Sequence, residues 1–277
     1  MINYRIIDRT AAALVVSLVL LTGWPQHACS QTAPINVALS EPGQPMPLRV
    51  QILSAKIEII GERRDDVQIE ISDASDGGRS IVTPSGTQRI GGGSYKLSAT
   101  ERNNTVDIGS DWRMSAIGLI VRVPSSASLD IATTNNSTID VTGVTGEMQL
   151  SNVNGPISVE GAAASVIAES VNKTVEVSFA SLADVSAVSL TSLNGNLLVG
   201  LPDRSSAQVQ IDTSRGEIAS DFEIEVQPSE PIVSRQERKG KVEVSIENMI
   251  IAIIIGGGPV IRRKTLNGDI QINRIAP

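Results

Sequence analysis

The chain has 277 residues, a formal net charge of −7 and an aromatic content of only 2%. Its single histidine and single cysteine, His27 and Cys29, both lie near the N-terminus. The rest of the chain therefore cannot supply the imidazole or thiol of Ser-His-Asp or Cys-His catalysis, or of zinc sites built on these residues. The negative charge, with no basic stripe, also argues against a nucleic-acid partner.

Residues 1–30 have the pattern of a secretory signal peptide. A basic start precedes an uncharged apolar run at 11–23, which is shorter than the roughly 20 residues of a membrane-spanning helix. Small residues predict cleavage after Ser30. The alternative is a lipoprotein signal acylated at Cys29, which the preceding Gln-His-Ala disfavours because it lacks an aliphatic residue three positions back. We therefore expect an exported protein, periplasmic or at the cell surface, with no membrane span in the mature chain.

Residues 31–123 carry alternating strands without a fixed period. The stretch 48–72 is typical of two alternating strands joined by a charged turn at Glu62–Asp66. We expect this N-terminal region to cap the repeats that follow, because an open end of a repeat stack would expose unpaired strand edge and apolar core.

From residue 124 to 277 one phrase recurs: apolar residues spaced by one, a small polar residue, an Asn-Gly-like turn, and apolar residues spaced by one again. Arg215 holds the first turn position in one copy, and asparagine holds it in the others, at Asn136, Asn154, Asn172, Asn194 and Asn267. The apolar residues that follow the turns lie at Ile139, Ile157, Val175, Leu197, Ile218 and Ile270, in steps of 18, 18, 22, 21 and 52 residues.

This period predicts an all-β fold, a parallel β-solenoid of about six irregular coils. Asparagine and glycine would form the corners because both tolerate left-handed backbone angles, and stacked asparagine side chains would form a ladder. Ile139, Ile157 and Val175 would form one interior row. The alternative is an antiparallel β-meander or sandwich, in which each Asn-Gly pair closes a hairpin.

The step of 52 residues indicates an insertion before the last unit. We predict a hairpin arm near 221–247, formed by the alternating segments 221–227 and 241–247. Its solvated tip would carry Arg235, Arg238, Lys239 and Lys241. The apolar segment 249–259 is too short to span a bilayer and is interpreted as a buried strand ended by glycines.

The composite pattern resembles a known family. The strand–charged turn–strand segment at 48–72, the stretch VPSSASLDIATTNN (123–136) and the serial NGxI-type units are together similar to the DUF4097 family of putative adhesins. The likeness covers roughly residues 45 to 275. It implies a bacterial extracytoplasmic protein with β-helical repeats, and it supplies no catalytic residues. Lys173 in the third unit and Ser-Arg-Gly-Glu in the fifth depart from the Asn-Gly pattern.

Two carboxylate pairs are candidates for acid–base chemistry in a polysaccharide-active β-helix. They are Asp65 with Asp66, and Asp107 with Asp111; paired carboxylates of this kind cleave glycosidic bonds. We interpret the first pair as an exposed turn and the second as flanking a loop. Only Trp112 stands near either pair as an aromatic platform.

The glycine-rich segments do not indicate a ligand site. The runs at 91–94 and 256–258 lack the Gly-Lys-Ser/Thr of a phosphate-binding loop, and Gly268-Asp269 occurs once rather than as a calcium-binding array. We therefore predict no catalytic, cofactor or metal site. The predicted function is a non-enzymatic, adhesin-like scaffold of the cell envelope or surface that binds a protein or a glycan. The alternatives are an accessory protein in envelope sensing and, less favoured, a polysaccharide-active enzyme.

Overall fold

The computed structural model describes residues 34–73, 97–110, 117–135, 137–227, 232–238, 241–247 and 250–275. The predicted signal peptide, Asp111, Trp112 and the glycine run 91–94 lie outside these residues. Across the described ranges the chain forms strands and turns and no helix. These ranges accordingly hold no helix with the length and apolar character of a membrane span.

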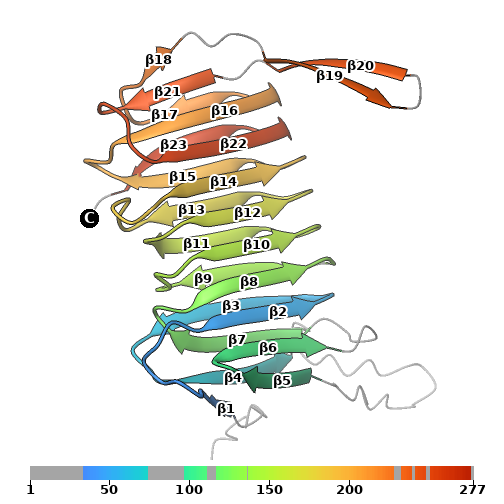
Figure 1. The fold of residues 1–277 in the computed structure, drawn as a ribbon, viewed down its shortest axis with the longest axis vertical. Helices are drawn as coiled ribbons and strands as arrows, with labels where there is room; N and C mark the ends of the chain where they lie inside the picture. The colour runs from blue at the N-terminus through green and yellow to red at the C-terminus, as the bar shows by residue number, and fades with distance from the viewer. Residues whose placement is uncertain are drawn as a thin grey trace, which may run out of the picture. The chain divides into compact units, whose positions relative to one another are not determined.

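Most of the described strands belong to two large, mostly parallel sheets, stacked in Figure 1 from β1 to β18. Sheet A runs in the order β1 (Ile35–Ala38), β4 (Asp66–Asp73), β7 (Ile117–Pro124), β3 (Ala55–Glu62), β9 (Thr138–Thr142), β11 (Ile157–Ala162), β13 (Val175–Phe179), β15 (Leu197–Pro202), β23 (Ile270–Ile275) and β17 (Ile218–Ser220). Sheet B runs in the order β18 (Glu225–Gln227), β21 (Ile250–Ile254), β16 (Ala207–Arg215), β22 (Val260–Asn267), β14 (Ala187–Ser192), β12 (Val166–Ser170), β10 (Met148–Asn152), β8 (Ser128–Thr133), β2 (Pro47–Ile52), β6 (Thr105–Ser110) and β5 (Leu97–Arg102).

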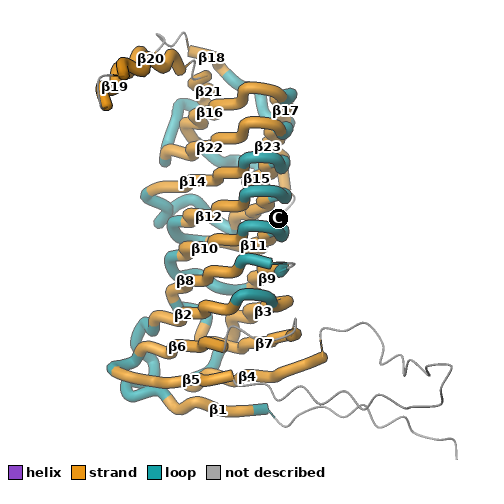
Figure 2. The backbone as a smooth tube through the Cα atoms, turned by 90° about the vertical axis from the view of Figure 1, so that its right-hand side faces the viewer, coloured by secondary structure: helices purple, strands orange, loops and turns teal. Residues whose placement is uncertain are grey.

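Each repeated turn joins the two sheets. The chain leaves sheet B at the end of β10, turns at Asn154 and Gly155, and enters sheet A as β11. We call such a sheet-B strand with the sheet-A strand that follows it a rung; Figure 2 shows the rungs from the side, with their connecting turns. Consecutive rungs from β8–β9 to β14–β15 pair in parallel. The repeats are therefore not hairpins, and the antiparallel meander does not describe them.

The predicted interior row is confirmed. Ile157 pairs in register with Ile139 on one side and with Val175 on the other, both in parallel. All three side chains are buried. This register follows from strand alternation, because a slip by one residue would turn the whole apolar set of a strand outward.

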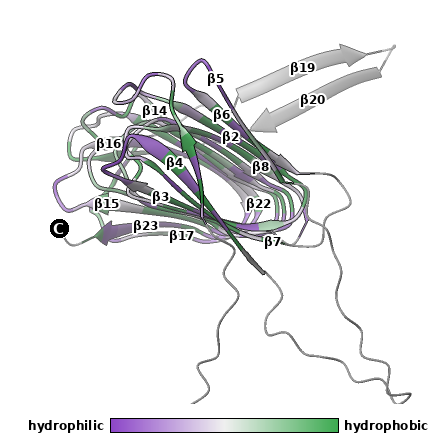
Figure 3. Cartoon of the chain, turned by 90° about the horizontal axis from the view of Figure 1, so that it is seen from below, coloured by the Kyte–Doolittle hydropathy of each residue, from purple (hydrophilic) through white to green (hydrophobic). Residues whose placement is uncertain are grey.

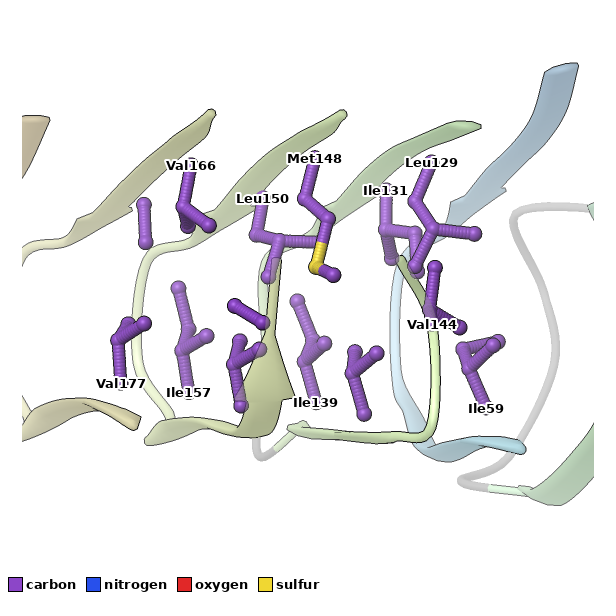
Figure 4. Close-up of a cluster of buried hydrophobic side chains, with 14 of the residues drawn as sticks. Ile59, Leu129, Ile131, Ile139, Val144, Met148, Leu150, Ile157, Val166 and Val177 are labelled. Carbon is purple, nitrogen blue, oxygen red and sulfur yellow. The ribbon is translucent and has the colours of Figure 1, made fainter. Parts of the chain in front are cut away.

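The core lies between the inner faces of the two sheets and is almost entirely aliphatic. In β10, Met148 and Leu150 point inward and are buried, while Gln149 between them is exposed. Figure 4 shows Met148 and Leu150 on one side of the interior and Ile139 and Ile157 on the other. The view in Figure 3 shows hydrophobic segments in the strands of both sheets. Most of the side chains that fill this interior are valine, isoleucine and leucine, which is consistent with the low aromatic content.

Two rungs stand out of chain order. The last rung, β22–β23, lies between β14–β15 and β16–β17, so the sixth turn phrase stacks on the fourth and the fifth stacks on the sixth. Near the other end, β2–β3 lies between β6–β7 and β8–β9. The stretch 48–72 thus contains three strands rather than two, and the turn at 62–66 joins β3 and β4, which do not pair because β7 lies between them.

Antiparallel strands occur at both ends of the stack. At the β1 end, β4 pairs antiparallel with β7 and with β1, and β5 pairs antiparallel with β6. At the other end, β21 pairs antiparallel with β16 and β18 pairs antiparallel with β21. These strands cover the parallel rungs at both ends of sheet B and at the β1 end of sheet A, where backbone groups would otherwise be open to another chain. At the other end of sheet A, β17 is the last strand in the described part of the chain.

A further hairpin consists of β19 (Ile232–Arg238) and β20 (Lys241–Glu247), with Arg238 opposite Lys241. The first strand of this arm is 232–238 and not 221–227, because Glu225–Gln227 forms β18 and pairs with β21. Residues 232–238 do not alternate between apolar and polar side chains, so the pattern favoured 221–227 instead. Arg235 and Arg238, which we expected at the tip, both lie within β19.

Candidate functional site

The turn asparagines form a hydrogen-bonded ladder along one corner of the stack. The Nδ2 atom of Asn172 donates to Oδ1 of Asn154 at 2.8 Å, and Asn194 donates in the same way to Asn172 at 2.9 Å. Asn267 donates to Asn194 at 2.9 Å, and Nη1 of Arg215 donates to Asn267 at 3.4 Å. The predicted ladder is confirmed, and its order follows the stack rather than the chain.

The small polar residue before each turn binds the neighbouring corner from inside. Oγ of Ser170 donates to the carbonyl oxygen of Gly155 at 3.1 Å, and Oγ1 of Thr265 donates to the carbonyl oxygen of Gly195 at 3.2 Å. Buried carbonyls need such partners, because each unpaired backbone group costs free energy comparable to a lost hydrogen bond. The recurrence of serine or threonine at this point in the phrase has this cause.

The corner glycines are required by close packing between rungs and not by left-handed backbone angles, as the sequence had suggested. Gly155, Gly195 and Gly268 all have φ outside the positive region. A Cβ atom on Gly195 would lie 2.1 Å from the carbonyl oxygen of Lys173, and one on Gly268 would lie 2.1 Å from the carbonyl oxygen of Gly195. The backbone of one corner approaches the next too closely for a side chain.

Beside these corners the outer face of sheet B is hollowed into a groove of about 820 Å³. One wall consists of outward residues that are in-register neighbours on β10, β12, β14, β22 and β16, namely Ser151, Glu169, Thr191, Lys264 and Asp212. The other wall consists of the residue just before each turn position, namely Val153, Val171, Leu193, Leu266 and Ser214. We call these the polar wall and the aliphatic wall.

The aliphatic wall is unusually open to solvent for its composition. Val171 is 37% exposed, Leu193 45% and Leu266 43%. They occupy successive levels of the stack, which lie about 4.8 Å apart. The sequence carried a signal for this wall that our reading missed, because an apolar residue precedes the asparagine in each of the units at 153, 171, 193 and 266.

The polar wall carries one compensated and one uncompensated acidic group. Nζ of Lys264 lies 2.8 Å from Oδ2 of Asp212 in an ion pair. Glu169 is exposed, and its carboxylate has no ion pair or hydrogen bond with any residue that the structure describes. Within the part of the chain that the structure describes, the groove therefore has an unpaired negative charge on β12.

The carboxylates considered from the sequence serve other purposes or lie outside the described residues. Arg64 holds the turn between β3 and β4 through ion pairs with Glu62 at 2.7 Å and Asp66 at 2.8 Å, while Asp65 is exposed. Asp107, on β6, lies 3.9 Å from Arg49 on the surface, and the position of Asp111 is not described. No set of three His, Cys, Asp or Glu residues within the described ranges could hold a metal ion.

Arg263 is a second feature that the sequence reading missed. It points into the core from β22 and is 1% exposed. Its Nη1 atom donates to the carbonyl oxygen of Gln271 at 3.1 Å, whereas Nε and Nη2 have no hydrogen-bond partner among the described residues. Burial without a counter-charge lowers the pKa of Arg263 to about 9. Alternation from Ile261 would have placed this residue inside.

No protein-family model and no curated protein matches the chain. The solved structures that are similar to it include two proteins connected with adhesion. One is a putative cell adhesion protein from Clostridium sporogenes ATCC 15579, with 10% identity, a TM-score of 0.37, and a match that covers 87% of this chain and 100% of that one. The other is a putative adhesin from Bacteroides fragilis NCTC 9343, with 11% identity, a TM-score of 0.31, and coverage of 87% and 96%. Likenesses this distant assign no function to the chain.

Proposed function

We propose that the protein is a non-enzymatic, exported binding scaffold, adhesin-like in character, whose groove on sheet B takes a protein or glycan at the cell envelope or surface. The observation that carries this proposal is the groove itself. Its volume of about 820 Å³ falls among ligand sites, which span about 300–1,000 Å³. Its walls are held in register by the sheet ladders and the asparagine ladder, so the binding surface is pre-formed.

The finer architecture belongs to the same proposal. We take residues 1–30 as a signal peptide, 31–123 as the region that contributes the cap at one end, and 124–277 as a parallel β-solenoid of about six irregular coils. The in-register parallel pairing of the repeat strands supports the solenoid. Membership of the DUF4097 family rests on the sequence pattern at 48–72, 123–136 and the serial turns.

The geometry of the groove does not suit glycosidic cleavage. Among the described residues that line it, the carboxylates are Glu169 and Asp212, and they are separated by three strand spacings, from β12 across β14 and β22 to β16. Three spacings amount to about 14 Å, whereas the carboxyl groups of glycosidases lie at most about 9.5 Å apart. Asp212 is in addition occupied by Lys264. The arrangement fits binding without turnover.

The proposal is tested with substitutions at two residues of nearly equal exposure. Leu193 in the aliphatic wall is 45% exposed, and Ile167, on the outer face of β12 outside the groove, is 43% exposed. Exported protein should bind immobilised cell-envelope fractions, Leu193→Asp should abolish that binding, and Ile167→Asp should retain it. Equal binding by both variants, or turnover of pectin, alginate or peptidoglycan fragments by the purified protein, would contradict the proposal.

A further inference from the structure

We infer that the groove recognises an extended polypeptide segment in which aliphatic side chains alternate with polar ones, at least one of them lysine or arginine. This inference rests on the proposed function and adds the chemical class of the partner. The contrast between the two walls is its starting point. An extended chain that lies along the groove directs successive side chains to opposite sides, so one set meets the aliphatic wall and the other the polar wall.

The aliphatic wall needs an apolar counterpart. Val171, Leu193 and Leu266 form a continuous strip across three rungs, and each keeps more than a third of its surface in water. Contiguous exposed apolar surface of this kind marks interaction sites, because its removal from water is favourable. Aliphatic side chains of a peptide supply the matching surface.

A glycan fits the same wall less well. Sugars present flat C–H faces that stack on flat aromatic rings, and branched aliphatic side chains offer no such plane. Among the described residues the aromatic side chains are Phe179 and Phe222, and both are buried. The described part of the groove thus has aliphatic contacts but no stacking platform.

The polar wall favours a cationic group on the ligand. Asp212 is neutralised by Lys264, but the exposed carboxylate of Glu169 has no partner among the described residues. A lysine or arginine of the ligand would form a charge-assisted hydrogen bond there. Ser151 and Thr191, which flank Glu169 in register, offer hydroxyls that both donate and accept, as the N–H and C=O groups of a peptide require.

The groove also limits how the segment binds and how long it is. The backbone groups of β10, β12, β14 and β22 are engaged within sheet B, so recognition proceeds through side chains and not by addition of a strand. The five strands that line the groove span about 19 Å, the length of about six extended residues.

The test uses a synthetic peptide, acetyl-Leu-Ser-Leu-Lys-Leu-Ser-Leu-amide, and the same peptide with glutamate in place of lysine. Isothermal titration should show binding of the lysine peptide and about tenfold weaker binding of the glutamate peptide. In Glu169→Lys this preference should reverse, because the unpaired charge of the groove changes sign. Glu176→Lys, on the exposed outer face of sheet A, should keep the original preference. Leu193→Ser should weaken binding about fivefold or more, and Ile167→Ser should leave it unchanged.

Chito-hexaose serves as the glycan probe. If it binds and Leu193→Ser abolishes that binding, the groove is a glycan site; the peptide inference then fails while the proposed function stands. Peptide binding that ignores both the lysine-to-glutamate change and the Glu169→Lys variant would overturn the inference. The absence of any peptide binding would also overturn the inference. In that case the envelope-binding assay with Leu193→Asp tests the proposed function independently.

Discussion

The central rungs and the last rung are built from the same turn phrase but reach their places differently. From β8–β9 to β14–β15 each rung stacks on the one before it in the chain. The rung β22–β23 comes after β16–β17 in the chain and yet lies beneath it, between β14–β15 and β16–β17. Its Asn267 nevertheless extends the asparagine ladder as the other turns do. The phrase thus determines the corner and the register of a rung, but not which rung it stacks on.

The interior of the last rung also differs. The in-register inner position is Leu150, Ala168 and Leu190 in the neighbouring rungs, and Arg263 in β22. A buried cation without a counter-charge is costly, because no partner offsets its removal from water; even buried ion pairs can often be replaced by apolar residues without loss of stability. The last rung therefore combines the regular corner with an irregular core.

The largest expected effect concerns the order of the rungs. In a Cys29→Ser background, cysteines at Thr191 and Lys264 should form a disulfide readily, because these residues are in-register neighbours at about 4.8 Å. Cysteines at Thr191 and Asp212 should not, because β22 separates their strands. Non-reducing electrophoresis of folded protein gives the answer. The reverse pattern would mean that the rungs stack in chain order.

The next effect compares the two interiors by truncation. Ile157→Ala in a central rung should lower the free energy of unfolding by about 2–5 kcal/mol, from lost burial and a residual cavity. Ile270→Ala in the last rung should cost a similar amount, since both residues are buried. Ser158→Asp, on the outward face of β11, should be nearly neutral. Chemical denaturation measures all three; a markedly smaller loss for Ile270→Ala would show that the last rung unfolds on its own.

Removing the buried cation should stabilise the protein, in contrast to the core truncations. Arg263→Leu should raise the free energy of unfolding by about 1–4 kcal/mol at neutral pH. Arg262→Leu is the matched control, because Arg262 is exposed and, within the described ranges, donates a hydrogen bond to Gln210. Urea titration of the three proteins tests the comparison. Destabilisation by Arg263→Leu alone would show that Nε and Nη2 have a partner in solution, such as a buried water or anion.

The same arginine predicts a pH dependence. Its folded-state pKa is lowered to about 9, so between that value and its ordinary pKa the unfolded chain binds more protons than the folded one. The unfolding free energy of the wild type should therefore rise with pH above about 9, relative to Arg263→Leu. The excess in unfolding free energy of Arg263→Leu over the wild type should therefore be largest at pH 8 and smaller at pH 10.5. A constant difference across this range would count against the lowered pKa.

The smallest expected effect concerns the asparagine ladder. Asn194→Ala removes one hydrogen bond to Asn172 and one from Asn267 on an exposed corner. It should lower the free energy of unfolding by about 1 kcal/mol. Ser158→Ala serves as the control. Asn196→Ala is unsuitable for this purpose, because the side chain of Asn196 accepts a hydrogen bond from the N–H of Asp269. Thermal unfolding of both variants measures the difference. If the two variants are equally stable, the ladder forms as a result of stacking but does not stabilise the fold.

The repeat register, the interior row and the ladder could be predicted because each depends on a local pattern. Alternation assigns Ile157 and Val159 to one face, and a step of 18 residues brings Ile157 beside Ile139 and Val175 once the rungs are parallel. The corner glycines were also found correctly, although their cause is contact between rungs and not backbone conformation.

The groove and the rung order were decided by the tertiary structure. Leu193 and Leu266 are 73 positions apart in the sequence, and they extend one aliphatic wall only because β22 pairs with β14. In the sequence Glu169 cannot be told from any other exposed glutamate. It belongs to the polar wall only because β10 and β14 pair with β12 on either side. A parallel strand edge accepts any chain with the right alternation, so the order of stacking depends on which edges remain free after the rest of the chain has packed. The local phrase carries no information about that choice.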